Sequence, residues 1–500
     1  MAGRRDYNIS VPKMNKELIL VAEGSDPERK ARQLAFKPIP FLISIMIGTA
    51  FWFIHYPSGI SPQGGHVLAL FLATIVGCIL NAAPLGLYAF IDVIILTVTH
   101  TVSAEVAFSG YSDSTIWLIV AAYCAAIGFT KTGLGLRIAY LFVKLFGKRT
   151  LTLGYALVLC ELVMSPAIPS NTARGAGIIF PIIQQLAKSY GSDPKLGTSR
   201  KIGSFLIFLG FHTNLLTSAV FLTAISTSPI AVSLAEQAGI HISWGLWALA
   251  ALLPAAVSLI VIPLVIYVLY KPEITEMPDA PVMAQKELEK MGPVKRSEIY
   301  MLLSFLVMIL LWIFGNALGV STTVAAFIGV TMLVFFGVIK WSDIPEQKSA
   351  WNLLVWLGPL LMMGAQLNRF GVIKWFSQTV GAEVHGLSWG VAFVVLGFVY
   401  YYSHYFFTSL IIHVNAFYAP FLAILVGMGA PPVASALYLA FLTALCAQPT
   451  NYGTLAGPLY FSSEYVSTKA WFGLGFAVSL LTFAIWTGLG LLWWNIIGIM

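Results

Sequence analysis

Apolar runs separated by short polar breaks recur along nearly the whole chain. We expect these runs to be helices, and they lie at residues 38–56, 66–81, 84–100, 114–130, 151–165, 203–226, 244–270, 299–317, 321–338, 350–367, 388–403, 431–449 and 471–497. A helix that crosses a bilayer needs about 20 apolar residues, so the shorter runs predict tilted or kinked helices. The pattern predicts an all-α polytopic membrane protein.

Two polar stretches divide this pattern. Residues 1–37 mix both charge signs and have no early apolar core, which argues against a cleavable signal peptide of the usual form. Within them, residues 26–34 predict a short amphipathic helix on the membrane surface. Residues 271–298 contain four prolines and predict a linker. The expected organisation is a polar tail, a first transmembrane half at 38–270, the linker, and a second transmembrane half at 299–500.

Composition and charge agree with a membrane location. The chain is 58% hydrophobic and only 10% charged, whereas soluble domains carry about 25% charged residues. The basic residues behind the net charge of +7 gather in the tail, the linker and short loops. This is the positive-inside pattern. It indicates a multi-pass protein of the cell inner (plasma) membrane with a cytoplasmic N-terminus and linker, and it needs no nucleic-acid partner.

The most informative polar break lies at residues 165–174, where two prolines, Ser170, Asn171, Thr172 and Arg174 stand between apolar runs. In lipid, a broken helix persists only where protein or a water-filled cavity surrounds it. The three side chains offer donors and acceptors, and a half-helix that begins there directs its positive end at an anion. The segment therefore predicts an anion site at mid-membrane depth, as in a transporter.

The two halves resemble each other, which indicates duplication. Gly371 follows Gly133 by 238 positions, and His413 follows Asn171 by 242. Each half has a polar-interrupted hairpin, near 166–188 in the first and near 404–428 in the second. We expect the copies to be inverted in the membrane, the architecture that supports alternating access.

A second polar break follows each hairpin. The residues concerned are Thr223, Ser226 and Thr227 in the first half and Thr450, Asn451 and Thr454 in the second. Hydroxyl side chains in membrane helices often only bond back to the backbone. Four interrupted segments in matched positions favour the alternative, that these residues form a binding site.

The segment Pro169–Arg174, followed by Gly177 and by Phe180–Pro181, resembles the first Ser-Asn-Thr signature of the divalent anion:sodium symporter family. The stretches 146–155, 267–275 and 349–352 are similar to the branch of 2-oxoglutarate/malate translocators and citrate/succinate antiporters. The resemblance covers essentially the whole chain after the tail.

This resemblance implies about eleven transmembrane helices plus two re-entrant hairpins, an inverted repeat, a scaffold, an elevator-type transport domain and a homodimer. It implies a dicarboxylate substrate such as 2-oxoglutarate, malate or succinate. Together with the polar breaks it gives a substrate-binding set of Ser170, Asn171, Thr172, Arg174, Thr223, Ser226, Thr227, His413, Thr450, Asn451 and Thr454.

The second hairpin departs from the sodium-coupled members of the family. Where they repeat Ser-Asn-Thr, this chain has Ile412–His413–Val414. A sodium ion needs several hard oxygen ligands, so we expect sodium-independent antiport. The alternative is a sodium-coupled di- or tricarboxylate symporter.

Ionisable groups inside a membrane are functional candidates. Arg174 can bind a substrate carboxylate or pair with Glu161, and His413 can donate to a carboxylate or be a hydrogen-bonded core histidine. We expect no cofactor and no metal, because Cys78, Cys124, Cys160 and Cys446 lie singly in apolar runs and lack metal-ligand spacing. No His-Glu-x-x-His, Gly-x-Ser-x-Gly or phosphate-loop motif indicates an enzyme.

Overall fold

The computed structural model describes residues 36–383 and 388–500. Most of the polar tail, including the amphipathic helix expected at 26–34, lies outside the described residues. Eight of the described helices are long and apolar enough to cross a membrane, and five shorter apolar helices accompany them. The prediction of an all-α polytopic protein is confirmed, while the count of eleven crossings stays a prediction.

The helices of the first half and the linker follow the apolar runs closely. They are α3 (Pro38–Trp52), α4 (Pro62–Ile79), α5 (Leu85–Val98), α6 (Ala104–Phe108), α7 (Ser114–Thr132), α8 (Leu134–Phe146), α9 (Thr150–Met164), α10 (Asn171–Arg174), α11 (Phe180–Ser189), α12 (Gly203–Val220), α13 (Thr227–Gln237), α14 (Trp244–Leu269) and α15 (Ala280–Met291). A π-helical turn, η2 (Gly175–Ile179), joins α10 to α11 into one continuous helix.

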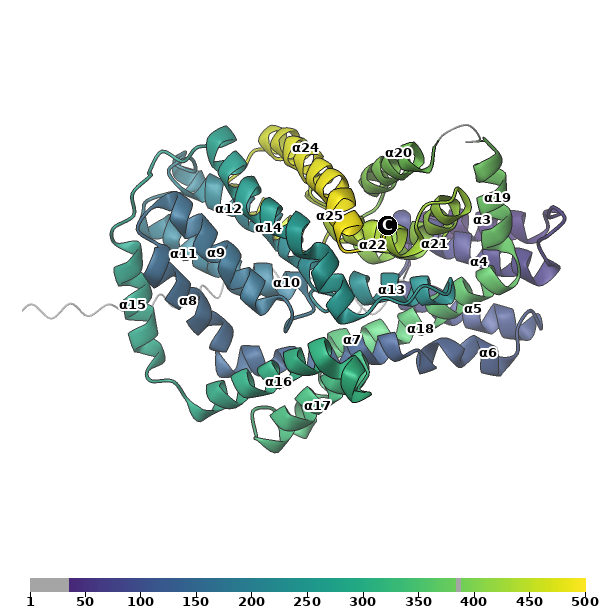
Figure 1. The fold of residues 1–500 in the computed structure, drawn as a ribbon, viewed down its shortest axis with the longest axis horizontal. Coiled ribbons are helices and arrows are strands. Elements are labelled where there is room, and N and C mark those ends of the chain that lie inside the picture. The colour runs from purple at the N-terminus through teal and green to yellow at the C-terminus, as the bar shows by residue number, and fades with distance from the viewer. Residues whose placement is uncertain (1–35, 384–387) are drawn as a thin grey trace, which may run out of the picture.

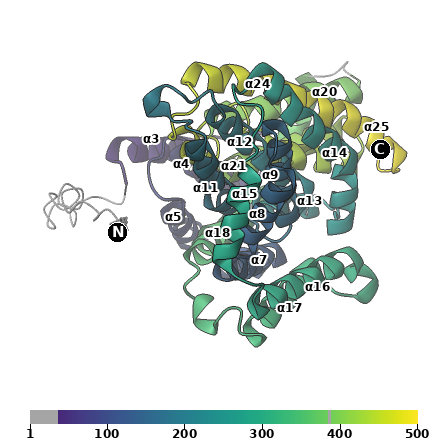
Figure 2. The same cartoon turned by 90° about the vertical axis from the view of Figure 1, so that its left-hand side faces the viewer.

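The second half repeats the same kinds of element. Its helices are α16 (Arg296–Leu318), α17 (Thr322–Phe335), α18 (Lys348–Arg369), α19 (Val372–Glu383), α20 (Trp389–Ser403), α21 (Leu410–Gly427), α22 (Pro432–Leu445), α23 (Ala456–Phe461), α24 (Thr468–Ala484) and α25 (Gly490–Ile496). Figure 2 shows α16 and α17 at one edge of the molecule, where α17 packs against α7.

The linker lies across one end of the molecule, the left end in Figure 1, and contains the helix α15, which packs against α8. Its backbone is tied to the base of α9. The Thr150 N–H donates to the Thr275 carbonyl at 3.0 Å, and the Met277 N–H donates to the Lys148 carbonyl at 2.8 Å. The opposite end, at the right in Figure 1, carries α19.

Two helical hairpins enter the molecule from these opposite ends. Hairpin 1 consists of α9 and the continuous helix α10–α11, and hairpin 2 consists of α20 and α21 (Figure 1). The ranges expected near 166–188 and 404–428 contain the turn and second limb of each hairpin. The first limbs, α9 and α20, precede those ranges.

Two discontinuous helices complete the centre of the fold. One is α12–α13, interrupted between Val220 and Thr227, and the other is α22–α23, interrupted between Leu445 and Ala456. Both interruptions were predicted from the polar breaks. The α12 helix begins at the linker end, whereas α22 begins beside the C-terminal end of α13, since Pro432 and Gln237 line one cavity. The two discontinuous helices therefore run in opposite directions.

The duplication can now be placed in register. Gly133 joins α7 to α8 with φ 76°, and Gly371 joins α18 to α19 with φ 83°, a conformation that favours glycine. Ser170 precedes the first residue of α10, and Ser409 precedes the first residue of α21. Ser409 follows Ser170 by 239 positions, which matches the glycine offset of 238.

This register corrects the alignment expected from the sequence. The helix starts, not the similarity of side chains, fix the correspondence, and they place Asn171 opposite Leu410. His413, which was aligned with Asn171, instead corresponds to Arg174. Each lies four residues after the serine that precedes its helix.

Candidate functional site

A cavity of about 160 Å³ lies where the hairpin tips meet the two discontinuous helices. It is lined by Tyr123, Pro169, Ser170, Asn171, Thr172, Ile225, Ser226, Thr227, Thr408, Ser409, Leu410, Ile411, Thr454 and Leu455. Among the described residues this lining is rich in hydroxyl groups and includes no charged side chain.

Four helix N-termini converge on this cavity. The helices α10, α13 and α21 begin at Asn171, Thr227 and Leu410, which all line it, and α23 begins directly after the lining residue Leu455. Each helix N-terminus carries roughly half a positive charge. The convergence makes the cavity electropositive without a cationic side chain, which suits an anion.

Side chains of hairpin 1 accept hydrogen bonds from some of the backbone N–H groups at the start of α10, and one side-chain donor keeps no partner among the described residues. The Ser170 Oγ accepts from the Ala173 N–H at 3.2 Å, and the Asn171 Oδ1 accepts from the Thr172 N–H at 2.9 Å. The Asn171 Nδ2 is buried and has no hydrogen-bond partner among the described residues. An amide N–H₂ at the cavity wall is therefore available to a bound anion.

The structure brings six of the eleven predicted site residues to the cavity wall: Ser170, Asn171, Thr172, Ser226, Thr227 and Thr454. The other five do not line it: Arg174, Thr223, His413, Thr450 and Asn451. Four of these five lie buried behind the wall, and Asn451 is half-buried.

Arg174 links hairpin 1 to the break in α12–α13 by hydrogen bonds. Its guanidinium is fully buried and donates to the carbonyls of Ile168 and Ala224 and, at 2.7 Å, to the Ser218 Oγ. The ion pairs found among the described residues do not include it. In this arrangement Arg174 does not line the cavity and forms no direct ion pair with Glu161 among the described residues, and its role in substrate binding stays a prediction.

Glu161 reaches the site indirectly. Its buried carboxylate accepts from the Asn214 Nδ2 at 2.8 Å and from the Thr217 Oγ1 at 3.1 Å. The same Asn214 nitrogen donates to the Asn171 carbonyl at 2.9 Å. Glu161 thereby holds the asparagine that positions the first residue of α10.

Thr223 and Thr450 have local structural partners. The Thr223 Oγ1 donates to the Pro166 carbonyl at 2.9 Å and so ties the hairpin 1 tip to the break in α12–α13. The Thr450 Oγ1 accepts from the Gly453 N–H at 3.2 Å, which shapes the break in α22–α23. Both residues act one layer behind the residues that line the cavity.

His413 lies behind the tip of hairpin 2. Its Nε2 is 2.9 Å from the Ser403 Oγ and 3.2 Å from the Tyr400 carbonyl oxygen. Of the two roles weighed for this residue, the hydrogen-bonded core histidine matches its position better than direct contact with an anion in the cavity.

Three polar residues that line the cavity are absent from the predicted set. Thr408 and Ser409 lie at the tip of hairpin 2, and Tyr123 comes from α7. Ser409 could have been found by aligning the two hairpins on their helix starts. Tyr123 carries no local signal, because it is one aromatic residue inside an apolar run.

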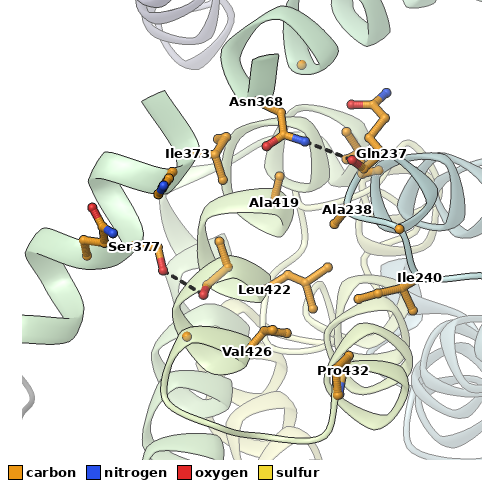
Figure 3. Close-up of a pocket in the computed structure, with 17 residues that line it drawn as sticks. Gln237, Ala238, Ile240, Asn368, Ile373, Ser377, Ala419, Leu422, Val426 and Pro432 are labelled. Carbon is orange, nitrogen blue, oxygen red and sulfur yellow. Dashed lines mark hydrogen bonds between the residues drawn. The ribbon is translucent and has the colours of Figure 1, made fainter. Parts of the chain in front are cut away.

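A larger cavity of about 730 Å³ lies apart from this site, between the end of α13 and the helices α18, α19 and α21 (Figure 3). Two hydrogen bonds cross its wall. The Asn368 Nδ2 donates to the Gln237 carbonyl at 2.9 Å, and the Ser377 Oγ donates to the Ala423 carbonyl at 2.8 Å. None of the predicted site residues lines this cavity.

The fold and the site define a helical membrane transporter rather than an enzyme. Residues 36–500 match the family described as the sodium:sulfate symporter transmembrane region, and the chain belongs to that family. This agrees with the resemblance found in the sequence.

Relatives extend over nearly the whole chain. The protein named "Putative malate transporter YflS" of Bacillus subtilis (strain 168) is 46% identical over 94% of this chain and 98% of its own. Dicarboxylate transporter 1, chloroplastic, of Spinacia oleracea is 42% identical over 92% and 81%. The citrate/succinate antiporter of Escherichia coli (strain K12) is 34% identical over 90% and 97%.

A solved structure shares the fold. The YdaH transporter of Alcanivorax borkumensis, described as having an unusual topology, superimposes with a TM-score of 0.56 at 13% identity. The match covers 78% of this chain and 87% of that one.

Proposed function

We propose that this protein exchanges dicarboxylates of the 2-oxoglutarate, malate and succinate type across the cell inner membrane, without sodium. The observation that carries the proposal is the convergence of four helix N-termini on one hydroxyl-lined cavity. Two carboxylates can share these positive helix ends. The names of the malate, dicarboxylate and citrate/succinate transporters among the relatives support this substrate class.

Direct binding in this proposal comes from the cavity wall. Ser170, Asn171, Thr172, Ser226, Thr227 and Thr454 are joined there by Thr408 and Ser409 of hairpin 2. Arg174 adds a positive charge behind the wall without touching the substrate. Thr223 and Thr450 hold the two breaks in shape.

Sodium independence rests on the tip of hairpin 2. In the observed register, the Ser-Asn-Thr of hairpin 1 corresponds to Ser409–Leu410–Ile411. Two oxygen-bearing side chains are thereby replaced by aliphatic ones, and a sodium ion depends on such oxygens. The segment that corresponds to Ser-Asn-Thr, first placed at Ile412–Val414, thus lies three residues earlier, with the same consequence.

Exchange, rather than one-way transport, follows from the buried charge. With a dianion bound, Arg174 and the helix N-termini are compensated. When the cavity holds no anion, Glu161 still offsets Arg174, but the positive helix ends would cross the apolar scaffold uncompensated, and a single uncompensated charge in a membrane costs at least ~2.5–3.5 kcal/mol. That cost corresponds to a return step tens to hundreds of times slower.

The moving unit in this proposal is an elevator that contains both hairpins and both discontinuous helices. Arg174 joins hairpin 1 to the first break, and the Tyr460 hydroxyl of α23 donates to the Gly175 carbonyl at 3.0 Å. These bonds join hairpin 1 to both discontinuous helices. The helices α7, α16, α17 and α18 would form part of the scaffold of a homodimer, with the N-terminus in the cytoplasm.

Proteoliposome uptake of labelled 2-oxoglutarate or succinate tests the proposal. Vesicles are either empty or preloaded with unlabelled dicarboxylate, each with and without a sodium gradient. Uptake that requires preloading and ignores sodium is the expected result. Sodium-driven uptake into empty vesicles would instead establish the alternative, a sodium-coupled di- or tricarboxylate symporter; the description of the family names sodium coupling.

A further inference from the structure

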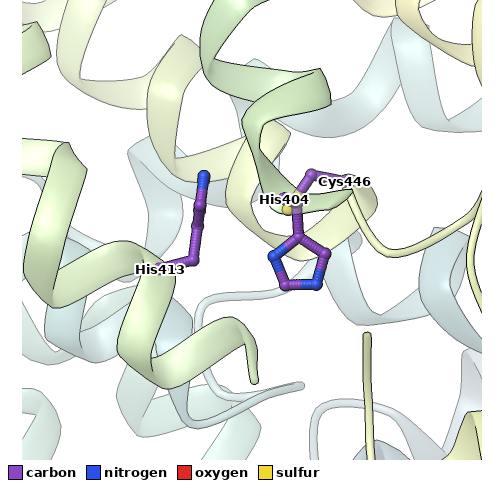
Figure 4. Close-up of side chains that lie close together, drawn as sticks. All are labelled: His404, His413 and Cys446. Atoms are coloured by element: carbon purple, nitrogen blue, oxygen red, sulfur yellow. The ribbon is translucent and has the colours of Figure 1, made fainter. Parts of the chain in front are cut away.

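Two histidines and a cysteine meet behind the tip of hairpin 2. His404 follows α20, His413 lies in the first turn of α21, and Cys446 directly follows α22. One ring nitrogen of each histidine and the Cys446 Sγ lie within 4.8 Å of one another, and all three residues are buried (Figure 4). Their separation along the sequence gives no metal-ligand spacing, so only the fold brings them together.

The hydrogen bonds of the two rings determine which nitrogens can bind a metal. The His404 Nε2 is 3.0 Å from the Gly453 carbonyl oxygen, and the His413 Nε2 is 3.2 Å from the Tyr400 carbonyl oxygen. A carbonyl oxygen only accepts, so both Nε2 atoms carry the proton in the neutral rings. The two Nδ1 atoms are then lone-pair acceptors.

Neither Nδ1 atom has a hydrogen-bond partner among the described residues. A buried acceptor without a donor costs free energy, and two such acceptors beside a thiol form a ligand set for a cation. Figure 4 shows His404 turning one ring nitrogen toward His413. Metal-binding histidines commonly donate their other N–H to a carbonyl in this way, which fixes the ring orientation.

The geometry points to a buried His₂Cys site for a borderline-to-soft cation such as Zn²⁺. Zinc accepts imidazole nitrogen at about 2.0–2.1 Å and thiolate sulfur at about 2.3 Å, so tetrahedral ligands lie roughly 3.4–3.6 Å apart. One ring nitrogen of each histidine and the Cys446 Sγ spread over at most 4.8 Å, so a bound ion would need to draw these atoms about 1 Å closer together. The Cys446 thiol, which donates to the Thr443 carbonyl at 3.3 Å, releases its proton when the metal binds.

Metal binding at this cluster would join hairpin 2 to the break in α22–α23. His404 and His413 belong to hairpin 2, whereas Cys446 opens the segment that contains the cavity residue Thr454. A bound cation would therefore restrain the tip of hairpin 2. This second part rests on the proposed function, and we expect it to appear as inhibition of exchange by zinc.

The binding test uses purified full-length protein and needs no transport. We expect about one Zn²⁺ per chain after equilibrium dialysis, and Co²⁺ in its place should give a thiolate-to-cobalt charge-transfer absorption band. Cys446→Ser should remove the band and weaken zinc binding at least about tenfold, since even the loss of an outer partner of a metal ligand costs that much. The serine hydroxyl can keep the bond to the Thr443 carbonyl, which protects the fold.

Cys160→Ser is the matched control, because Cys160 is equally buried but lies in hairpin 1. It should bind zinc like the unaltered chain. Equal zinc binding by the Cys446→Ser variant and the unaltered chain, or a cobalt spectrum without a thiolate band, would overturn the site. Zinc that binds at Cys446 but inhibits exchange equally in the Cys446→Ser variant would overturn the restraint on hairpin 2, whichever substrate is transported.

Discussion

The two hairpins share one geometry but differ in the side chains behind their tips. Glu161 lies nine positions before Ser170 in hairpin 1, and Tyr400 lies nine positions before Ser409 in hairpin 2. Arg174 and His413 correspond in the same way, each four positions after the serine of its hairpin. A carboxylate and a guanidinium in one hairpin thus correspond to a phenol and an imidazole in the other.

Glu161 and Tyr400 make equivalent contacts. Glu161 accepts hydrogen bonds from α12, and Tyr400 is hydrogen-bonded to the Thr443 hydroxyl of α22 at 2.6 Å. Because hairpin 2 forms the same structure with neutral groups, the fold of a hairpin does not require buried charge. Variants at matched positions of the two hairpins can therefore test whether the charges of hairpin 1 serve transport.

The largest expected effect is that of Arg174→Ala. It removes hydrogen bonds to Ile168, Ala224 and Ser218 together with the fixed positive charge. Hydrogen bonds to charged groups contribute about 1.5–3 kcal/mol each, so we expect exchange to fall more than about 100-fold, with a lower Tm. His413→Ala should reduce exchange far less. If both variants keep strict exchange in preloaded proteoliposomes, the fixed-charge mechanism is wrong.

Asn171→Ala should come next. The variant loses the buried Nδ2 donor that has no partner in the described structure, and a hydrogen bond to a charged carboxylate contributes about 1.5–3 kcal/mol. We expect the KM for succinate to rise about 10- to 100-fold.

Leu410→Ala is the control for Asn171→Ala, since Leu410 lines the same cavity at the corresponding position. It removes no polar group, and we expect its KM to change less than about threefold. Similar KM values in the two variants would show that Asn171 does not bind the substrate.

A smaller effect is expected for Glu161→Gln, which replaces one acceptor oxygen by an amide facing Asn214 and Thr217. Leaving a buried donor without a partner costs about 1–3 kcal/mol, so the Tm should fall and the KM should rise about tenfold. Tyr400→Phe removes one neutral hydrogen bond of about 1 kcal/mol. A Tyr400→Phe variant as impaired as Glu161→Gln would remove the distinction between the hairpins.

The smallest effects are expected for the serines at the helix starts. Ser170 caps α10, whereas the Ser409 side chain makes no capping bond. Both variants lose one hydroxyl at the cavity wall, and Ser170→Ala also loses a helix cap worth about 1 kcal/mol, so its KM should exceed that of Ser409→Ala about fivefold. Radiolabelled uptake over a range of succinate concentrations measures both, and the reverse order would contradict the capping difference.

The apolar runs predicted most of the fold because bilayer helices must be long and apolar. The two breaks at residues 221–226 and 446–455 were also visible, since prolines and hydroxyl residues rarely interrupt such runs without cause. The helix starts were less visible. Similar polar residues suggested that Asn171 matches His413, but the register follows from backbone conformation at Ser170 and Ser409.

Within the candidate site, sequence reasoning found the residues whose own segment is broken. It could not separate Thr454, which lines the cavity, from Thr450, which braces the same turn. It also missed Tyr123, whose place at the cavity depends only on how α7 packs. Contacts between distant segments carry no periodic signal in the chain.

The convergence of helix starts has a consequence for how such a protein can diverge. The attraction for negative charge comes largely from peptide groups, which every amino acid supplies, so no single substitution abolishes it. Replacements at Ser226 or Thr408 can therefore change which sizes of anion the cavity accepts, while the electrostatic attraction of the helix ends for negative charge persists. Proteins with such a site can therefore change which organic anions they accept through a series of single, individually tolerated substitutions.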